Sequence, residues 1–150
     1  MSLKIIHTAD WHLGQTFFGY DRYEEHEAFL SWLIDILTLR QTDVLLIAGD
    51  VFDVANPSAA AQRRFFRFLR EANRRNPQLQ IVIIAGNHDS AARLEAPIPL
   101  LEELNTSIVG AVPRTDLCKI DFDSLLIPLY NKEGKREAIC LAVPYLRQGD

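Results

Sequence analysis

The sequence DVLLIAGDVFD, residues 43–53, sets the pattern on which the fold of this 150-residue chain is built. Its apolar first part, Asp43 to Ala48, predicts a buried β-strand, and the glycine and carboxylates that follow predict a sharp turn. Two further segments repeat this arrangement, IIHTADWH at residues 5–12 and IVIIAGNHD at residues 81–89. Each predicted strand therefore carries polar side chains at its carboxyl end.

Segments of helix length separate these strands. The first helix is expected to begin at an Asp21 N-cap and to run to about Arg40, and the second to begin at a Ser58 N-cap and to end near Arg74. Apolar residues give the first helix a wide core-facing stripe: Phe29, Leu30, Trp32, Leu33, Ile36, Leu37 and Leu39. The alternation of strands and helices predicts right-handed βαβ units around a mainly parallel sheet, and therefore an α/β fold.

The rhythm changes after Ser107. Short candidate strands at residues 108–109, 117–120, 125–130 and 138–143 follow one another closely, and this spacing predicts a second, partly antiparallel sheet. A chain of 150 residues has the size of one ordinary domain. Because residues 144–147 leave a candidate strand just before the last residue, we interpret the chain as the front part of something longer.

The composition is that of a soluble globular protein, with 48% apolar and 24% charged residues. No apolar run is long enough to cross a bilayer, and no basic segment precedes an extended apolar stretch, so we expect neither a membrane span nor a secretion signal. Two isolated cysteines suit a reducing cytoplasm. The net charge of −4 argues against a generally basic nucleic-acid coat but allows a local basic patch.

The three strand exits carry side chains of the kinds that bind divalent metals. Carboxylates, imidazoles and an amide occur there in close spacing: Asp10, His12, Asp50, Asp53, Asn87, His88 and Asp89. These are the hard and borderline ligands of divalent-ion sites. A single Asp-x-His triplet occurs by chance in many loops. Three such groups, each at a strand exit, indicate a metal-dependent phosphoester hydrolase.

The same residues suggest a division of roles. Two ions about 3.5–4 Å apart would polarise a phosphoryl oxygen and activate water near neutral pH. His88 stands beside one candidate ligand and is free to give a proton or a hydrogen bond to the leaving oxygen. A carboxylate, from Asp53 or Asp89, would fix the tautomer of that imidazole. A site for two ions nevertheless needs more ligands than the three motifs supply.

The three motifs resemble those of the calcineurin-like metallophosphoesterases. Residues 6–14, IHTADWHLG, are similar to the first motif of that family, residues 49–53 with the following Pro57-Ser58 to the second, and residues 86–89 to the third. The phosphatases of the family usually carry Arg-Gly after the second motif, where this chain has Val54-Ala55. This difference favours the nuclease branch of the family. The resemblance spans essentially all 150 residues.

The resemblance implies a sandwich of two β-sheets flanked by helices (α-β-β-α), of which residues 1–150 form the N-terminal part, with the rest of the nuclease domain and the C-terminal regions absent. The implied metal ligands are Asp10 and His12 for a first Mn²⁺ ion, Asp50 as a bridge and Asn87 for a second ion. His88 would be the catalytic histidine at the leaving group, with Asp53 as its orienting partner. The later motifs of the family add histidine ligands, but no histidine follows His88, so the second metal site is incomplete.

The activity implied by the resemblance is that of a manganese-dependent nuclease, a double-strand exonuclease and single-strand endonuclease. The resemblance also implies a task, the processing of DNA ends and hairpins in repair, recombination and replication. It further implies an SMC-like ATPase subunit as partner, a homodimer and a cytoplasmic location. Two alternatives stay open from the residues. One is a phosphoesterase that acts on a small substrate such as a cyclic nucleotide, and the other is a metal-poor fragment that folds without catalysis.

Two histidines and one helix face have a structural interpretation beside a functional one. His7 lies within the first strand, where we expect it to be buried and hydrogen-bonded, or else to support the metal ligands. His26 faces the core of its helix, and we assign it no catalytic role. Four arginines line the face of the second helix opposite its apolar side: Arg63, Arg67, Arg70 and Arg74. They form either a solvated helix face or a contact to DNA phosphates.

Dimerisation through the helices that follow the second and third motifs would require exposed apolar residues there. We expect an exposed Phe66 and the cluster of Leu100, Leu101 and Leu104 to provide them. An ordinary hydrophobic core is the alternative explanation for the same four residues.

Overall fold

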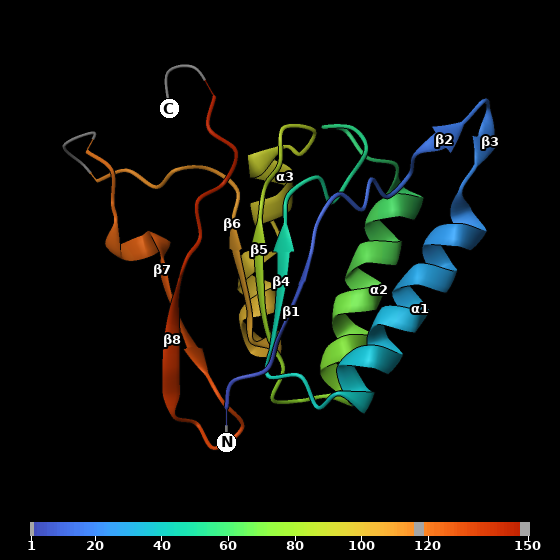
Figure 1. Ribbon diagram of the computed structural model, residues 1–150. Helices are drawn as coiled ribbons and strands as arrows, with labels where there is room; N and C mark the ends of the chain where they lie inside the picture. Colours follow the sequence, from blue (N-terminus) through green and yellow to red (C-terminus); the bar gives the residue numbers. More distant parts are fainter. Residues whose placement is uncertain (1, 116–118, 148–150) are drawn as a thin grey trace.

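The central element of the fold is a four-stranded parallel sheet. The computed structural model describes residues 2–115 and 119–147 (Figure 1). In spatial order the strands are β1 (Ile5–Thr8), β4 (Val44–Ala48), β5 (Gln80–Ile84) and β6 (Thr106–Val109), and all neighbours are parallel. The predicted parallel sheet is thus confirmed. The assignment of residues 108–109 to the second sheet is wrong, because these residues pair with β5 and complete the first sheet.

The helices lie on one face of this sheet. The long helices α1 (Tyr23–Leu39) and α2 (Ala59–Arg75) precede β4 and β5, and three short turns, α3 (Ala91–Glu95), α4 (Ile98–Leu101) and η1 (Glu102–Leu104), lead to β6. They share one hydrophobic cluster with the sheet residues that face them. The predicted Ser58 cap is present, since the Ser58 hydroxyl accepts a hydrogen bond from the Ala61 N–H at 3.1 Å.

The predicted Asp21 N-cap of α1 is wrong. Arg22 occupies that position, without a side-chain capping bond. A short hairpin, β2 (Thr16–Phe17) and β3 (Tyr20–Asp21), precedes the helix, and its pairing of Thr16 with Asp21 keeps Asp21 in a strand. Gly19 forms its turn, with a φ of +82° that a residue with a side chain rarely adopts. Helix α1 can therefore begin only after the hairpin has ended.

The predicted width of the α1 stripe is also wrong. Trp32 and Leu39 are 56% and 75% exposed, whereas Ile34 is buried. The sheet and α2 cover only one side of α1, so side chains beyond that side face solvent. Of the remainder of the predicted stripe, Phe29, Leu30, Leu33 and Leu37 lie within or against the core, and Ile36 is half-buried.

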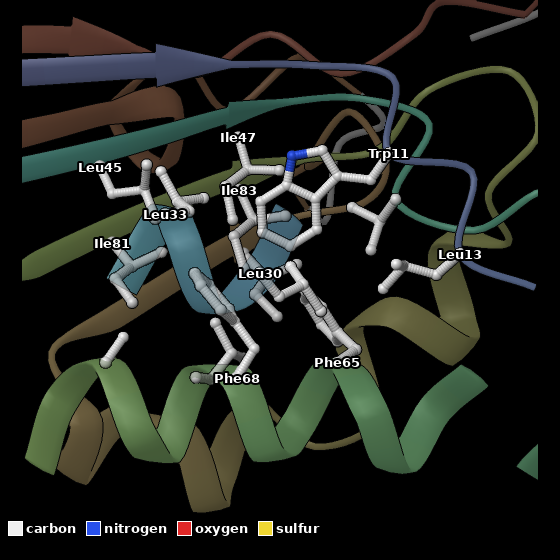
Figure 2. Packing of buried hydrophobic residues seen from close by; sticks show 14 of the residues in the cluster. Trp11, Leu13, Leu30, Leu33, Leu45, Ile47, Phe65, Phe68, Ile81 and Ile83 are labelled. Atoms are coloured by element: carbon white, nitrogen blue, oxygen red, sulfur yellow. The ribbon is translucent and has the colours of Figure 1, made fainter. Parts of the chain in front are cut away.

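The core around α1 and α2 is centred on Trp11 (Figure 2). Its indole makes edge-to-face contacts with Phe29 and Phe68, at centroid distances of 5.7 and 5.1 Å, and its Nε1–H donates to the Thr8 hydroxyl at 3.0 Å. Trp11 stands between two of the predicted metal ligands. Packing of one buried ring therefore fixes the backbone from which both ligands project.

The predicted second sheet is confirmed as an antiparallel pair, β7 (Leu126–Tyr130) and β8 (Arg136–Leu141), preceded by the 3₁₀ turn η2 (Asp123–Leu125). It lies on the face of the central sheet opposite α1 and α2 (Figure 1), around a second cluster that includes Val44, Val82 and Leu129. The candidate strand at 117–120 falls partly outside the described residues, and Ile120 makes an isolated bridge to Arg114. The α/β fold with a parallel sheet flanked by helices is confirmed.

Among the residues described, no helix combines the length and apolar character needed to span a membrane.

Buried His26 makes the stability of this fold depend on pH. Its side chain is 6% exposed, and burial, followed by the charges of Arg64 and Arg22, lowers its pKa below the ordinary value. At His26 the unfolded chain then binds a proton more readily than the folded chain. The contribution of this histidine to the free energy of unfolding is therefore full above about pH 6.5 and is lost as the pH drops below that value. In urea unfolding at pH 7.5 and 5.5, His26→Gln should lose less stability on acidification than wild type. An equal loss in both proteins would contradict this origin.

Candidate metal centre

The carboxyl ends of β1 and β4 continue as two loops that run side by side. Four backbone hydrogen bonds join them. Three run from the N–H groups of Asp10, His12 and Leu13 to the carbonyls of Gly49, Asp50 and Val51, at 3.1, 2.9 and 2.9 Å, and the fourth runs back from the Asp53 N–H to the Leu13 carbonyl at 3.4 Å. Parallel strands end at one edge of a sheet, which is why segments that are distant in the sequence meet here. The first two motifs thus form one rigid pair of loops.

Glycines allow the third motif to approach this pair. A Cβ added to Gly86 would lie 2.1 Å from the Asp50 Oδ1 atom and 2.3 Å from its backbone nitrogen, which no side chain could tolerate. A Cβ on Gly49, whose φ is +84°, would lie 3.0 Å from the Gly86 Cα. The Asp50 carboxylate accepts a hydrogen bond from the His88 N–H at 3.0 Å. Backbone therefore packs on backbone, with Asp50 at the junction of all three motifs.

Three of the predicted ligands have left-handed backbone conformations. Asp10, His12 and Asp50 have φ values of 56°, 46° and 46°. Such conformations cost roughly 1–3 kcal/mol each for residues other than glycine and persist only where the surroundings impose them. The interloop hydrogen bonds impose them here, and the resulting turns bring the side chains of these residues together.

The side chains of Asp10, His12 and Asp50 form a donor group that fits a divalent ion. Each offers one ligand atom, and these atoms all lie within 4.8 Å of one another. The His12 Nε2 atom is 3.7 Å from Asp50 Oδ2, too far for a hydrogen bond but close to the spacing of two ligands on one ion with bonds of about 2.1 Å. Asp10, Asp50 and Asn87 all line one pocket of about 300 Å³. The predicted ligands thus meet in one place.

A second group consists of His12, Asp53 and His88, whose ligand atoms also lie within 4.8 Å of one another. The two imidazole rings meet edge to face at 5.0 Å. The Asp53 backbone carbonyl accepts a hydrogen bond from His88 Nδ1 at 2.7 Å. This bond is the main cause that raises the pKa of His88 above its ordinary value, and neighbouring carboxylates act in the same direction against partial desolvation.

The Asp53 carboxylate has a different position from the one predicted. Its Oδ1 atom lies 3.2 Å from Nδ1 of His12, although not in the geometry of a hydrogen bond. Asp53 contacts the His88 ring, as expected of its orienting partner, but through its backbone oxygen and not through its carboxylate. The spacing of residues in the sequence cannot show whether the backbone carbonyl or the carboxylate of Asp53 contacts His88.

Asp89 binds the loops and does not hold the His88 ring in this structure. It is fully buried, and its carboxylate accepts hydrogen bonds from the backbone N–H groups of Val51, Phe52 and Gly86 at 3.1, 3.0 and 2.9 Å. These donors belong to the second and third motifs. Asp89 thus ties the two motifs together from beneath the site, and the prediction that it orients His88 is not the arrangement observed.

Asp89→Asn should destabilise the fold by roughly 1.5–3 kcal/mol, because a neutral amide replaces a buried carboxylate and turns an N–H₂ group toward backbone donors. Urea unfolding at pH 7 measures this loss. Asp35→Asn is the matched control, since Asp35 is exposed and paired with Arg75 on the surface. Equal stability of the two variants would show that Asp89 does not hold the loops.

His7 is exposed, and the expectation that it is buried is wrong. Side chains alternate along β1: Ile6 packs on the helix side, so His7 points to the other face, where this edge strand is poorly covered. His26, by contrast, is buried as expected.

The predicted arginine stripe lies on α2. Arg63, Arg67 and Arg70 border a groove of about 560 Å³ against the first turns of α1, and Arg74 lies outside it. Arg67 pairs with Glu27 and Arg74 with Glu71, while Arg63 and Arg70 are exposed. Sequence reasoning missed Arg64, which is buried, bonds to Glu27 at 2.9 Å and lies 4.1 Å above the Tyr23 ring.

The proposed dimer contacts are largely core residues in this chain. Phe66 is half-buried against the main cluster, which corrects its predicted exposure. Leu101 is buried and Leu104 packs against the same cluster, so the core explains both. The Leu100 side chain lies outside the described residues.

Comparison with known proteins adds to this geometry. The family model described as calcineurin-like phosphoesterase matches residues 3–137. The chain is 50% identical over 148 residues to the SbcD subunit of the nuclease SbcCD of Rhodobacter capsulatus, covering 99% of this chain and 36% of that protein. The protein of the same name from Escherichia coli is 34% identical, over 99% of this chain and 34% of that protein. The one from Bacillus subtilis is 40% identical, over 81% of this chain and 31% of that protein. The chain thus spans about a third of the length of these relatives.

Proposed function

Because this chain belongs to the calcineurin-like phosphoesterase family, we propose that it hydrolyses phosphodiester bonds of DNA as part of a nuclease subunit. The observation that carries the proposal is the meeting of Asp10, His12 and Asp50 at one edge of the sheet, with ligand atoms within 4.8 Å. The nuclease name of the relatives supports DNA as the substrate.

The proposed ligands are Asp10 and His12 for a first ion, Asp50 between the ions and Asn87 for a second. Two divalent ions, with Mn²⁺ as the proposed metal, would supply charge stabilisation of the phosphoryl oxygens and activation of water. The protein holds its carboxylates and imidazole in place through the interloop hydrogen bonds and the packing of Trp11. Within residues 1–150, the proposed ligands of the first ion are thus Asp10, His12 and Asp50, and those of the second are Asp50 and Asn87.

His88 is the proposed catalytic histidine. A carbonyl oxygen only accepts hydrogen bonds, so the contact with the Asp53 carbonyl places a proton on Nδ1 and leaves Nε2 for the substrate. When Nε2 also carries a proton, the ring can give that proton to a leaving oxygen. The His88 side chain is exposed and therefore accessible to a polymer.

The wider biological role forms part of the same proposal. The relatives are named as one component of an SbcCD nuclease, and we propose SbcC, an SMC-like ATPase, as the partner and processing of DNA ends and hairpins in repair, recombination and replication as the task. A cytoplasmic location and a homodimer follow from that role. The interpretation of residues 1–150 as the N-terminal part of a nuclease domain stays a prediction, and so does phosphate contact by Arg63, Arg67, Arg70 or Arg74.

A substrate comparison tests the proposal. The protein is incubated with Mn²⁺ and either linear duplex DNA or a chromogenic phosphate bis-ester. We expect Mn²⁺-dependent shortening of the DNA that stops when EDTA is added. Turnover of the small ester without any cleavage of DNA would instead support the alternative of a small-substrate phosphoesterase. Absence of turnover on both substrates, with no Mn²⁺ bound, would indicate a fragment without catalysis.

A further inference from the structure

The segment that follows β8 crosses from the second sheet to the metal centre. Its Tyr145 N–H donates a hydrogen bond to the Ala85 carbonyl at 2.8 Å, and Arg147 Nη2 donates to the Asp89 carbonyl at 3.1 Å. Ala85 directly precedes the third motif, and Asp89 is the last residue of that motif. The segment is therefore fixed at both sides of the loop that carries the catalytic histidine.

Tyr145 is a wall of the candidate metal pocket. It lines the space of about 300 Å³ that Asp10, Asp50 and Asn87 also line, and it is 52% exposed. The aromatic residues of the core, Trp11 and Phe65 among them, are buried. Tyr145 thus presents an uncovered aromatic side chain directly beside side chains that bind ions. Sequence reasoning missed it because tyrosine is not a typical ligand of this metal class, although it too follows a strand exit.

The polar part of the pocket suits ions and, through them, a phosphate. Two carboxylates, an amide and glycine backbone line this part, and the side chains of Ala48, Ile84 and Ala85 complete the wall. The nucleosides on either side of a phosphate bound there would then lie near the pocket rim. An aromatic ring is suited to contact with them, because any base can stack on it whatever its sequence. Val143 and Pro144 extend the same apolar rim.

We propose that Tyr145 is a substrate-binding residue, on which the base of the nucleoside next to the scissile phosphate stacks. This inference rests on the proposed nuclease function and specifies which part of the nucleotide the site recognises besides phosphate. A merely structural role is poorly suited to the ring, because the segment is anchored by the backbone N–H of Tyr145 and by Arg147. An alanine at position 145 keeps that backbone anchor, so the variant should fold.

The test measures affinity for a short single-stranded oligonucleotide with Mn²⁺, in a His88→Gln background that prevents cleavage. Tyr145→Ala should weaken binding about tenfold, within the range expected for one stacked base, whereas Tyr145→Phe should bind like the parent. Tyr130→Ala is the matched control, because Tyr130 is 44% exposed but lies on β7 outside the metal pocket. The fluorescence of a 2-aminopurine base placed at the cleavage position should be quenched when the parent protein binds. This quenching should be lost only in Tyr145→Ala.

An oligonucleotide with one abasic position separates stacking from a structural effect. If Tyr145 contacts that base, removal of the base should weaken binding to the parent protein but hardly change binding to Tyr145→Ala. Equal losses in both proteins, or parent-like affinity of Tyr145→Ala, would overturn the Tyr145 inference while leaving the nuclease proposal intact. Absence of any Mn²⁺-dependent oligonucleotide binding by the parent would contradict both.

Discussion

His88→Gln is expected to lower the rate of phosphodiester cleavage by about 10²–10⁴-fold while the affinity for Mn²⁺ stays close to that of wild type. Glutamine can still reach the Asp53 carbonyl with an N–H group, but it cannot give a proton to a leaving oxygen. The backbone N–H of residue 88, which bonds to the Asp50 carboxylate, is unchanged. The loss should therefore appear in kcat rather than in metal binding.

Steady-state kinetics on DNA and a Mn²⁺ titration of the same preparations measure both quantities. His7→Gln is the control, because His7 is an exposed histidine of β1 outside both donor groups. Its kcat should equal that of wild type. A His88→Gln variant that loses Mn²⁺ as well as activity would show that residue 88 holds the metal, and our assignment of its role would be wrong.

Asp50→Asn should abolish detectable cleavage and weaken Mn²⁺ binding by more than about 100-fold. Loss of a residue that only supports a ligand already costs 10–100-fold, and Asp50 stands at the junction of all three motifs. The substitution removes the negative charge that would face the ions. It keeps a side-chain oxygen that can accept the His88 N–H, so the loops should retain their positions.

Calorimetric titration of Mn²⁺ and urea unfolding distinguish loss of metal from loss of fold. Asp123→Asn provides the comparison, since Asp123 is an exposed carboxylate of η2 on the second-sheet side. We expect wild-type stability for both variants in the absence of metal, and wild-type Mn²⁺ affinity only for Asp123→Asn. Wild-type cleavage by Asp50→Asn would remove Asp50 from the proposed site.

The sequence predicts the central sheet and the location of the site because both depend on local signals. Apolar runs that end in Gly49 and Gly86 mark the strand exits, and parallel strands must end at a common edge. The Ser58 cap and the two-faced α2 are equally local. For these features the chain near each residue contains all the information needed.

The features that the sequence does not predict depend on distant contacts. Exposure of Trp32 is set by what covers α1, and the partner of β6 is set by the path of the chain over more than 20 residues. The roles of Asp53 and Asp89 depend on which oxygen faces which donor, a detail of side-chain orientation. Tyr145 reaches the metal centre only because β8 leads across from the other sheet.

The position of a bound ion tests the proposed metal centre most directly. Crystals grown with Mn²⁺ and measured near the manganese absorption edge would locate the ion by its anomalous scattering. We expect the strongest peak between the side chains of Asp10, His12 and Asp50, within bonding distance of all three. A map with no peak there, or with its only peak elsewhere on the chain, would contradict the proposal that these three residues form a metal centre.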